Sequence, residues 1–246
     1  MTDPLVLRTD TDGVAVVELN RPHRKNAMTG PLMAALADTM EAVARDESVE
    51  AVVFCGAGGA FCSGLDLDEY NADPPPDWLA DAPTVMRRAH VSLAACPVPI
   101  VVALERYAIN GGAALALAGD LIVVGEESWL QVGEVKLGMA APNNLAWLAP
   151  RYPLSTIMQI VVPGERLPGP RLRELGVAYD VVPDPEVRSR AEALGAQLAG
   201  YPRGAGRMMK QGVLRVTDHT EHAAWFEDVG RLAARADGRQ VRPGRM

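Results

Sequence analysis

Phe61-Cys62-Ser63-Gly64-Leu65-Asp66-Leu67 is a glycine-bearing turn that comes after the apolar run 51–55. A second turn of this kind, Asn110-Gly111-Gly112-Ala113-Ala114, comes after the apolar run 98–104. Helix N-termini and tight glycine turns leave backbone N–H groups without partners. Two such ends that lie together can direct two donors at one oxygen, which makes an oxyanion hole suited to chemistry on a thioester carbonyl.

Four segments resemble the crotonase, or enoyl-CoA hydratase/isomerase, superfamily, and they keep the family order over roughly residues 5–190. Gly58-Gly59-Ala60-Phe61-Cys62-Ser63-Gly64-Leu65-Asp66-Leu67 resembles the first oxyanion signature, and Tyr107-Ala108-Ile109-Asn110-Gly111-Gly112-Ala113-Ala114-Leu115 resembles the second. The other two matches are Asn20-Arg21-Pro22 with Lys25-Asn26-Ala27-Met28, and Gly133-Glu134-Val135-Lys136-Leu137-Gly138.

The resemblance implies a single-domain α/β fold, a crotonase-like spiral of repeated ββα units with a C-terminal helical trimerisation region. Residues 1–190 would form the spiral core with an acyl-CoA site, and residues 191–246 the helical region of the same domain. The implied partners are an acyl-CoA substrate and copies of the chain, as a homotrimer or a dimer of trimers. The resemblance implies no metal or redox cofactor, since coenzyme A enters as part of the substrate.

Local patterns predict the elements around the turns. Residues 5–7 and 14–19 flank Asp12-Gly13 and predict a β-hairpin. Thr29 is the expected N-cap of a helix whose apolar residues recur at helical spacing. Continuous apolar runs at 51–55, 98–104 and 121–124 are typical of strands buried on both faces. A loop is expected at 71–77, helices at 78–95, 187–199, 205–216 and 221–236, and a solvated basic tail at 239–245.

Composition narrows the class of protein. The chain has 246 residues, 48% of them hydrophobic, which is ample for a large core, and its net charge of −7 argues against a nucleic-acid surface. The phosphates of CoA would need a local basic patch, which Arg21, Arg24 and Lys25 could supply, although a solvated charged loop explains these residues equally well.

The three cysteines form no CxxC pair. With no signal segment and no long apolar run, we expect a cytoplasmic protein without a membrane span.

The resemblance assigns the two oxyanion donors to the backbone N–H groups of Leu65 and Gly111. It also places CoA and substrate contacts around the two signatures, at Arg24, Lys25, Asn26, Ala27, Ser63, Gly64, Asp66 and Gly112. Residues that could form the wall of the acyl pocket are Tyr70, Trp78, Ala114 and Asn143; ordinary helix packing is the alternative for Tyr70 and Trp78.

One departure from the family decides the expected reaction. Hydratases of this family hold a water with two glutamates, and the position of the first is Ala114 here. The second falls on Glu134, which stands among apolar neighbours, so burial would raise its pKa toward the range of a general base. One carboxylate and two oxyanion donors resemble the pattern of the family's enoyl-CoA isomerases, so we predict a proton shift by Glu134 through an enolate.

Further departures leave alternatives open. Asn143 and Asn144 stand where the family has a proline-glycine-rich turn. They could hydrogen-bond a polar substrate or a water, but a role in capping the next helix is favoured. Hydration would need a replacement for the missing glutamate, which could be Glu105, Asn143 or a group of the substrate. A non-catalytic acyl-CoA binder is the alternative from another class. Cys62 as a nucleophile and a metal at His219 and His222 are both disfavoured, because neither has the partners that such a site needs.

Overall fold

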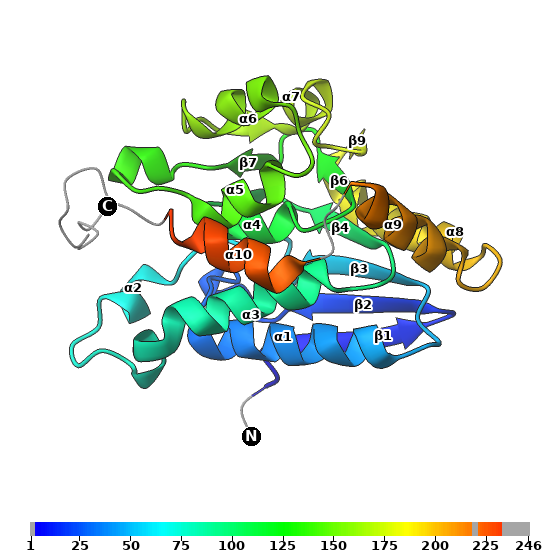
Figure 1. Ribbon diagram of the computed structural model, residues 1–246, viewed down its shortest axis with the longest axis horizontal. Helices are drawn as coiled ribbons and strands as arrows, with labels where there is room; N and C mark the ends of the chain where they lie inside the picture. The colour runs from blue at the N-terminus through cyan, green and yellow to red at the C-terminus, as the bar shows by residue number, and fades with distance from the viewer. Residues whose placement is uncertain (1–2, 218–220, 233–246) are drawn as a thin grey trace.

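The computed structural model describes residues 3–217 and 221–232 and contains two β-sheets (Figure 1). The large sheet has the strand order β1 (Val6–Thr11), β2 (Val14–Leu19), β3 (Ala51–Gly56), β4 (Ile100–Leu104), β6 (Leu121–Gly125), β9 (Asp180–Val182). Its β1–β2 pair is antiparallel and its other pairs are parallel. The small sheet has the order β5 (Tyr107–Ile109), β7 (Trp129–Gln131), β8 (Leu167–Pro168).

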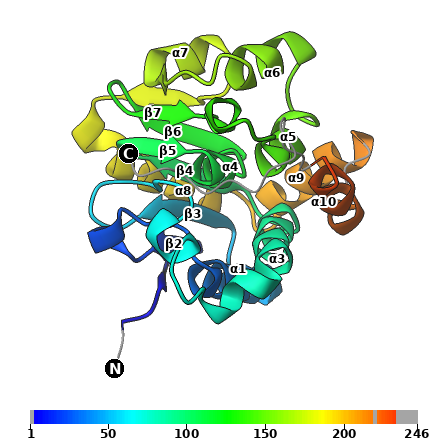
Figure 2. The same ribbon diagram turned by 90° about the vertical axis from the view of Figure 1, so that its left-hand side faces the viewer.

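Helices cover both faces of the large sheet (Figures 1 and 2). On one face α1 (Gly30–Arg45) and α3 (Ala82–Ala94) enclose the main core, and on the other α8 (Val187–Ala199) buries Val187, Ala191 and Leu194 against the sheet. The remaining helices are α2 (Leu67–Tyr70), α4 (Gly111–Ala116), α5 (Pro142–Leu148), α6 (Leu154–Val161), α7 (Gly169–Glu174), α9 (Ala205–Val216) and α10 (His222–Gly230). Short 3₁₀ segments are η1 (Pro22–Arg24), η2 (Asp77–Asp81), η3 (Glu134–Leu137) and η4 (Asp184–Glu186).

Successive coils of the chain run from the large sheet to the small sheet and then into a helix. This order is seen in β4–β5–α4 and again in β6–β7–η3. The coil after β3 packs beside the small sheet, because Cys62 forms a parallel bridge with Ala108 of β5. The coil after β2 stacks on it through a parallel bridge between Met28 and Leu65. The starts of α1, α2, α4 and η3 therefore lie in one row, although they are far apart in sequence.

The local predictions for these elements are confirmed. The hairpin turns at Asp12 and Gly13, whose φ values of 49° and 82° suit the right-handed twist of its strands. Thr29 caps α1 by accepting a hydrogen bond from Leu32 N–H at 3.3 Å. The predicted buried runs are β3, β4 and β6, in which almost every side chain is inaccessible.

Two helix boundaries differ from the predictions, and one predicted segment lies outside the described residues. The helix expected at 78–95 begins with the 3₁₀ segment η2, and α3 starts at Ala82 with a proline in its first turn. The last helix, expected at 221–236, ends at Gly230, and residues 233–236 lie outside the described part. The basic stretch 239–245 lies outside it as well.

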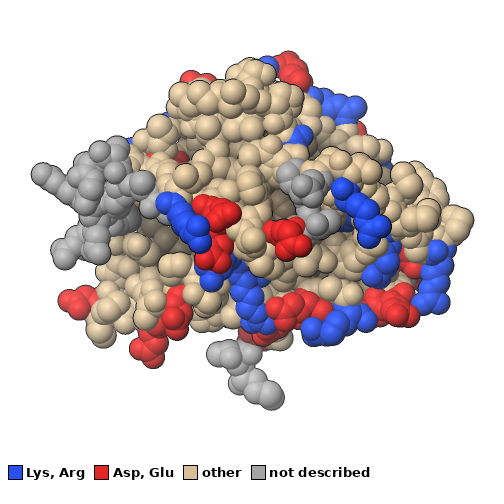
Figure 3. Space-filling model, in the orientation of Figure 1, with Lys and Arg blue, Asp and Glu red and all other residues tan. Residues whose placement is uncertain are grey.

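Helix α10 is held against the body by aromatic packing. Phe226 stacks on His90 of α3 with ring centroids 5.7 Å apart and meets Trp147 of α5 edge-on at 5.1 Å. On the face drawn in Figure 3, Lys and Arg side chains lie among Asp and Glu and form no continuous basic field. Within the described residues, no helix is both long enough and apolar enough to cross a membrane.

Candidate active site

The row of helix starts brings the two glycine turns into contact. Gly64 has φ 92°, and a Cβ there would lie 2.8 Å from the carbonyl oxygen of Ile109 and 3.8 Å from Cβ of Asn110. The absence of a side chain at Gly64 thus permits the first turn to pack on the second. On the other side of Asn110, its Oδ1 accepts a hydrogen bond from Gly133 N–H at 2.9 Å. Asn110 is therefore enclosed by the two neighbouring coils.

The two expected oxyanion donors lie at neighbouring coils of this row. Met28 N–H donates to Gly64 O at 2.7 Å, and Asp66 N–H donates to Met28 O at 2.9 Å. In a parallel bridge of this kind the intervening residue turns its own N–H away from the partner segment, so Leu65 N–H is directed away from Met28. Gly111 is the first residue of α4, so its N–H has no acceptor inside the helix. Both groups are thus available donors in one row.

Glu134 begins η3, on the coil that follows the second turn. Its Oε1 accepts a hydrogen bond from Asn144 Nδ2 at 3.0 Å, whereas its Oε2 is buried and has no hydrogen-bond partner. Burial raises the pKa of Glu134 from its usual 4.5 to about 7, and two hydrogen bonds, one from its own backbone N–H and one from Asn144, oppose that rise. A carboxylate with this pKa can both take and return a proton near neutral pH.

Asn144 was not expected to contact Glu134. The sequence favoured a capping role for the pair Asn143 and Asn144, and this prediction is wrong: α5 begins after Ala141 with Pro142, and its N-cap has no side-chain hydrogen bond. Asn144 is instead 1% exposed, and its Nδ2 bonds both Glu134 and the carbonyl oxygen of Asn110, the latter at 3.2 Å. The sign in the sequence that could have indicated this contact was the pair of asparagines at the place where the family has a glycine-rich turn.

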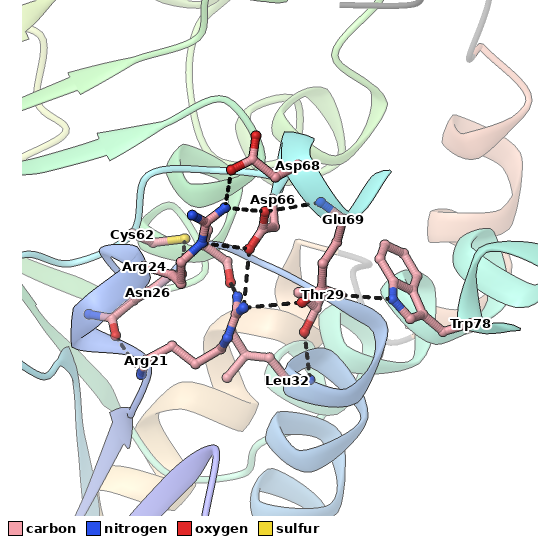
Figure 4. A network of polar contacts seen from close by, with 11 residues as sticks. Arg21, Arg24, Asn26, Thr29, Leu32, Cys62, Asp66, Asp68, Glu69 and Trp78 are labelled. Carbon is pink, nitrogen blue, oxygen red and sulfur yellow. Dashed lines mark hydrogen bonds and ion pairs between the residues drawn. The ribbon is translucent and has the colours of Figure 1, made fainter. Parts of the chain in front are cut away.

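Arg24 and Asp66, two of the residues expected to contact CoA, belong to a network of charges around one buried carboxylate (Figure 4). Asp66 is 2% exposed, and its carboxylate pairs with Arg21 at 3.1 Å and with Arg24 at 2.9 Å. Arg24 pairs further with Asp68 at 2.6 Å. These ion pairs hold the pKa of Asp66 below its usual range against the opposing effect of burial. The basic patch that the sequence suggested is thus largely neutralised by its own carboxylates, and Lys25 remains exposed beside it.

Asn26 has a structural place in this network. It is fully buried, its Nδ2 donates to the carbonyl oxygens of Ala57 and Ala60, and its Oδ1 accepts from Arg21 N–H. Cys62 donates to Asn26 O at 3.1 Å, and burial raises the pKa of its thiol to about 12. A thiol in this state is a poor nucleophile, which agrees with the sequence analysis. Contacts from Ala27, Ser63 and Gly112 to CoA stay predictions.

The candidates for the acyl pocket are dispersed. Trp78 is half-buried against the start of α1 and donates from Nε1 to Glu69 Oε2 at 3.2 Å, whereas Tyr70 is 41% exposed. Ala114 is fully inaccessible within the main core, and Asn143 is half-buried beside Asn144. A cavity of about 950 Å³ lies between α3, α5, α9 and α10, and Leu65, Gly111 and Glu134 do not line it. A pocket wall made by these four residues therefore stays a prediction.

A role for Glu105 as the substitute acid that the sequence left open stays a prediction. The charged groups that influence its side chain are Arg188, Glu18 and Glu192, on the α8 side of the large sheet. Glu134 lies in the row of helix starts, where its side-chain partner is Asn144. A metal at His219 and His222 finds no support either: His219 lies outside the described residues, and those described contain no group of three potential ligands.

Comparisons with known proteins agree with this architecture. The family described as enoyl-CoA hydratase/isomerase matches residues 9–244. The 1,2-epoxyphenylacetyl-CoA isomerase of Escherichia coli K12 is 30% identical over 205 residues, which cover 82% of this chain and 78% of that protein.

Two solved structures are similar over nearly the whole chain. An enoyl-CoA hydratase from Mycobacterium avium subsp. paratuberculosis has a TM-score of 0.82 at 26% identity, covering 95% of this chain and 93% of that one. A putative enoyl-CoA hydratase from Thermobifida fusca, solved in complex with CoA, has a TM-score of 0.77 at 26% identity, covering 93% and 92%. The expected crotonase fold is confirmed, and the chain belongs to the enoyl-CoA hydratase/isomerase family.

Proposed function

We propose that this protein is an acyl-CoA double-bond isomerase in which Glu134 is the single acid–base group. The observation that carries the proposal is one buried carboxylate, with a pKa of about 7, in the same row as the Leu65 and Gly111 N–H groups. Ala114 supplies no second carboxylate, so the site is equipped to move a proton better than to orient a water between two glutamates.

The proposed reaction is a shift of one proton. The thioester oxygen of a 3-enoyl-CoA accepts hydrogen bonds from Leu65 N–H and Gly111 N–H, and Glu134 removes a proton from C2. The resulting dienolate carries its negative charge on the thioester oxygen, where the two donors stabilise it. Glu134, now protonated, returns the proton to C4, and the double bond moves from C3–C4 to C2–C3. Atoms and charge balance without a further reactant.

The relatives support an acyl-CoA substrate. The Escherichia coli relative is named as an acyl-CoA isomerase, and the Thermobifida fusca structure was solved with CoA bound. The proposal includes backbone contacts to CoA from the segments around Lys25 and Gly64. It also includes assembly as a homotrimer or dimer of trimers, supported by the exposed apolar side chains that α9 carries at Met208, Met209, Val213 and Val216. Light scattering on the purified protein tests the assembly.

Hydration is the second candidate, and one observation favours it. Asn144 Oδ1 and Glu134 Oε2 are both buried acceptors without a partner. They belong to side chains that are hydrogen-bonded to each other, so one water could donate a hydrogen to each. Asn144 would then take the place of the glutamate that Ala114 does not supply.

One absorbance experiment separates the candidates. Wild type and Glu134→Gln are given 3-hexenoyl-CoA and, separately, crotonyl-CoA, while the absorbance of the conjugated enoyl thioester is followed. A rise with the first substrate that is lost in the variant supports isomerisation. A fall with the second supports hydration. If the absorbance changes with neither substrate and the protein binds butanoyl-CoA tightly, it is a non-catalytic acyl-CoA binder, and this result would contradict the proposal.

A further inference from the structure

We infer that Asn144 is a positioning residue that occupies Oε1 of Glu134 and reserves Oε2 as the oxygen that exchanges protons. The inference deepens the proposed function and rests on it for its catalytic meaning. It starts from the asymmetry of the carboxylate: Oε1 accepts from Asn144 Nδ2 at 3.0 Å, whereas Oε2 is buried without a partner.

The orientation of the Asn144 amide follows from its surroundings. Its Nδ2 lies 3.0 Å from the carboxylate of Glu134 and 3.2 Å from the carbonyl oxygen of Asn110, so its two hydrogens meet two acceptors. The flipped amide would set Oδ1 against those same two oxygens, which is repulsive. Since the side chain is 1% exposed, solvent does not compete for these bonds.

The same amide connects the base to the oxyanion turn. Asn110 immediately precedes Gly111 and is held in the left-handed region, with φ 51°. Asn144 binds the carbonyl oxygen of Asn110, and Gly133, the residue before Glu134, donates its N–H to Asn110 Oδ1. The base and the donor at Gly111 are thus tied to one residue from two directions. These hydrogen bonds hold the base and the N–H donor at a fixed distance from each other. A displacement of a reacting group by about 1 Å can lower the rate about 100-fold.

The Asn144 hydrogen bond is also the main side-chain influence on the charge of Glu134. Within the described residues Glu134 forms no ion pair, no charged side chain contributes to the shift of its pKa, and Lys136 on its own segment points to solvent. A donated hydrogen bond favours the ionised carboxylate, whereas burial disfavours it. Removing the donor should therefore raise the pKa of Glu134 further.

The test measures that pKa directly and needs no substrate. The protein is labelled with ¹³C at the glutamate carboxyl carbon, and Glu134→Gln identifies the resonance of Glu134. Asn144→Leu should raise the pKa of Glu134 by roughly one pH unit, from the loss of a hydrogen bond to a charged group. Asn144→Asp keeps the shape but replaces the donor with an acidic group, and should raise the apparent pKa at least as much.

The matched control is Asn20→Leu, which removes an exposed amide-to-carbonyl hydrogen bond of 2.8 Å to Pro4 and should leave the Glu134 titration unchanged. An unchanged Glu134 pKa in a folded Asn144→Leu protein overturns the inference. If that variant does not fold, Asn144→Ala, which also removes the donor and adds no charge, decides by the same criterion.

A second readout tests positioning during turnover. Exchange of the C2 protons of butanoyl-CoA in D₂O should fall roughly 10- to 100-fold in kcat for Asn144→Leu, with KM within about twofold of wild type. A mainly raised KM would contradict a positioning role. Absence of exchange in wild type would refute the proposed function instead, and the titration would still decide whether Asn144 holds the carboxylate.

Discussion

Replacing Glu134 with glutamine should stabilise the protein at high pH and leave its stability unchanged at low pH. The folded protein keeps the Glu134 proton up to a pH of about 7, whereas an unfolded glutamate releases it near 4.5. Between these values the folded state binds more protons than the unfolded state. The free energy of unfolding therefore falls as the pH rises through this window. Glutamine has the same shape and no charge, so the variant escapes this loss.

The size of the effect follows from the displacement of the pKa. A rise from 4.5 to about 7, at about 1.4 kcal/mol per pH unit, corresponds to about 3 kcal/mol. This whole amount is lost above about pH 7 and none of it below about pH 4.5. For a chain of this length, about 3 kcal/mol corresponds to a difference in Tm of roughly 6–12 °C.

The assay is thermal or urea unfolding of wild type and Glu134→Gln at intervals from pH 4.5 to 8. The difference between the two proteins should be near zero at the acid end, grow through the interval and level off above pH 7. Glu47→Gln, an identical change at an exposed position, serves as the control. A difference that stays constant across the interval would refute the reasoning, because it would mean that burial does not shift the pKa of this carboxyl.

Three further predictions concern activity and the charge network. Since the ionised base is required, kcat/KM should fall about tenfold per pH unit below a pH of about 7, and a rate profile on 3-hexenoyl-CoA checks the pKa assigned to Glu134. Gly111→Pro removes one donor at a helix position that accepts proline, and should lower kcat by about 10²–10³. A Cβ at position 111 would lie 2.3 Å from Met28 Cε. Met28→Ala is therefore introduced both into the Gly111→Pro variant and into the protein with which that variant is compared. Asp66→Asn should cost about 2–3 kcal/mol in urea unfolding because it removes the buried charge that pairs with both Arg21 and Arg24 and leaves them only the more exposed Glu69 and Asp68, whereas Asp68→Asn, whose side chain is 82% exposed, should change little.

Much of the fold could be predicted because its signals are local. The hairpin at Asp12-Gly13 needs only a turn of the right handedness, and the Thr29 cap needs only one side chain near the helix it begins. The runs that became β3, β4 and β6 are apolar on both faces, so alternation with helices follows from length and pattern. The family resemblance then supplied the order of the coils, which no local pattern contains.

Side-chain partners could not be predicted in the same way. Asp66 and Arg24 are 42 residues apart, and the pattern around either gives no sign that one neutralises the other. Glu105 stands close in sequence to the second glycine turn, yet the basic side chain that influences its pKa is Arg188 of α8. Asn144 is ten residues from Glu134, and asparagine is a common helix cap, so capping was the natural expectation until the structure showed that α5 already begins at Pro142.

In the proposed mechanism, the stacking of the coils explains why the chemistry depends on backbone groups and one carboxylate. Each coil offers a helix start, and the bridges between Met28 and Leu65 and between Cys62 and Ala108 fix neighbouring starts at the spacing of adjacent strands. Oxyanion donors built this way depend on the path of the chain more than on side-chain identity, so the residue at 65 can vary. Glu134 has no such redundancy, since its pKa depends on burial, on a hydrogen bond from its own backbone and on one side-chain donor, the amide of Asn144. Changes of reaction within this fold should therefore arise at the base and its asparagine before they arise at the two turns.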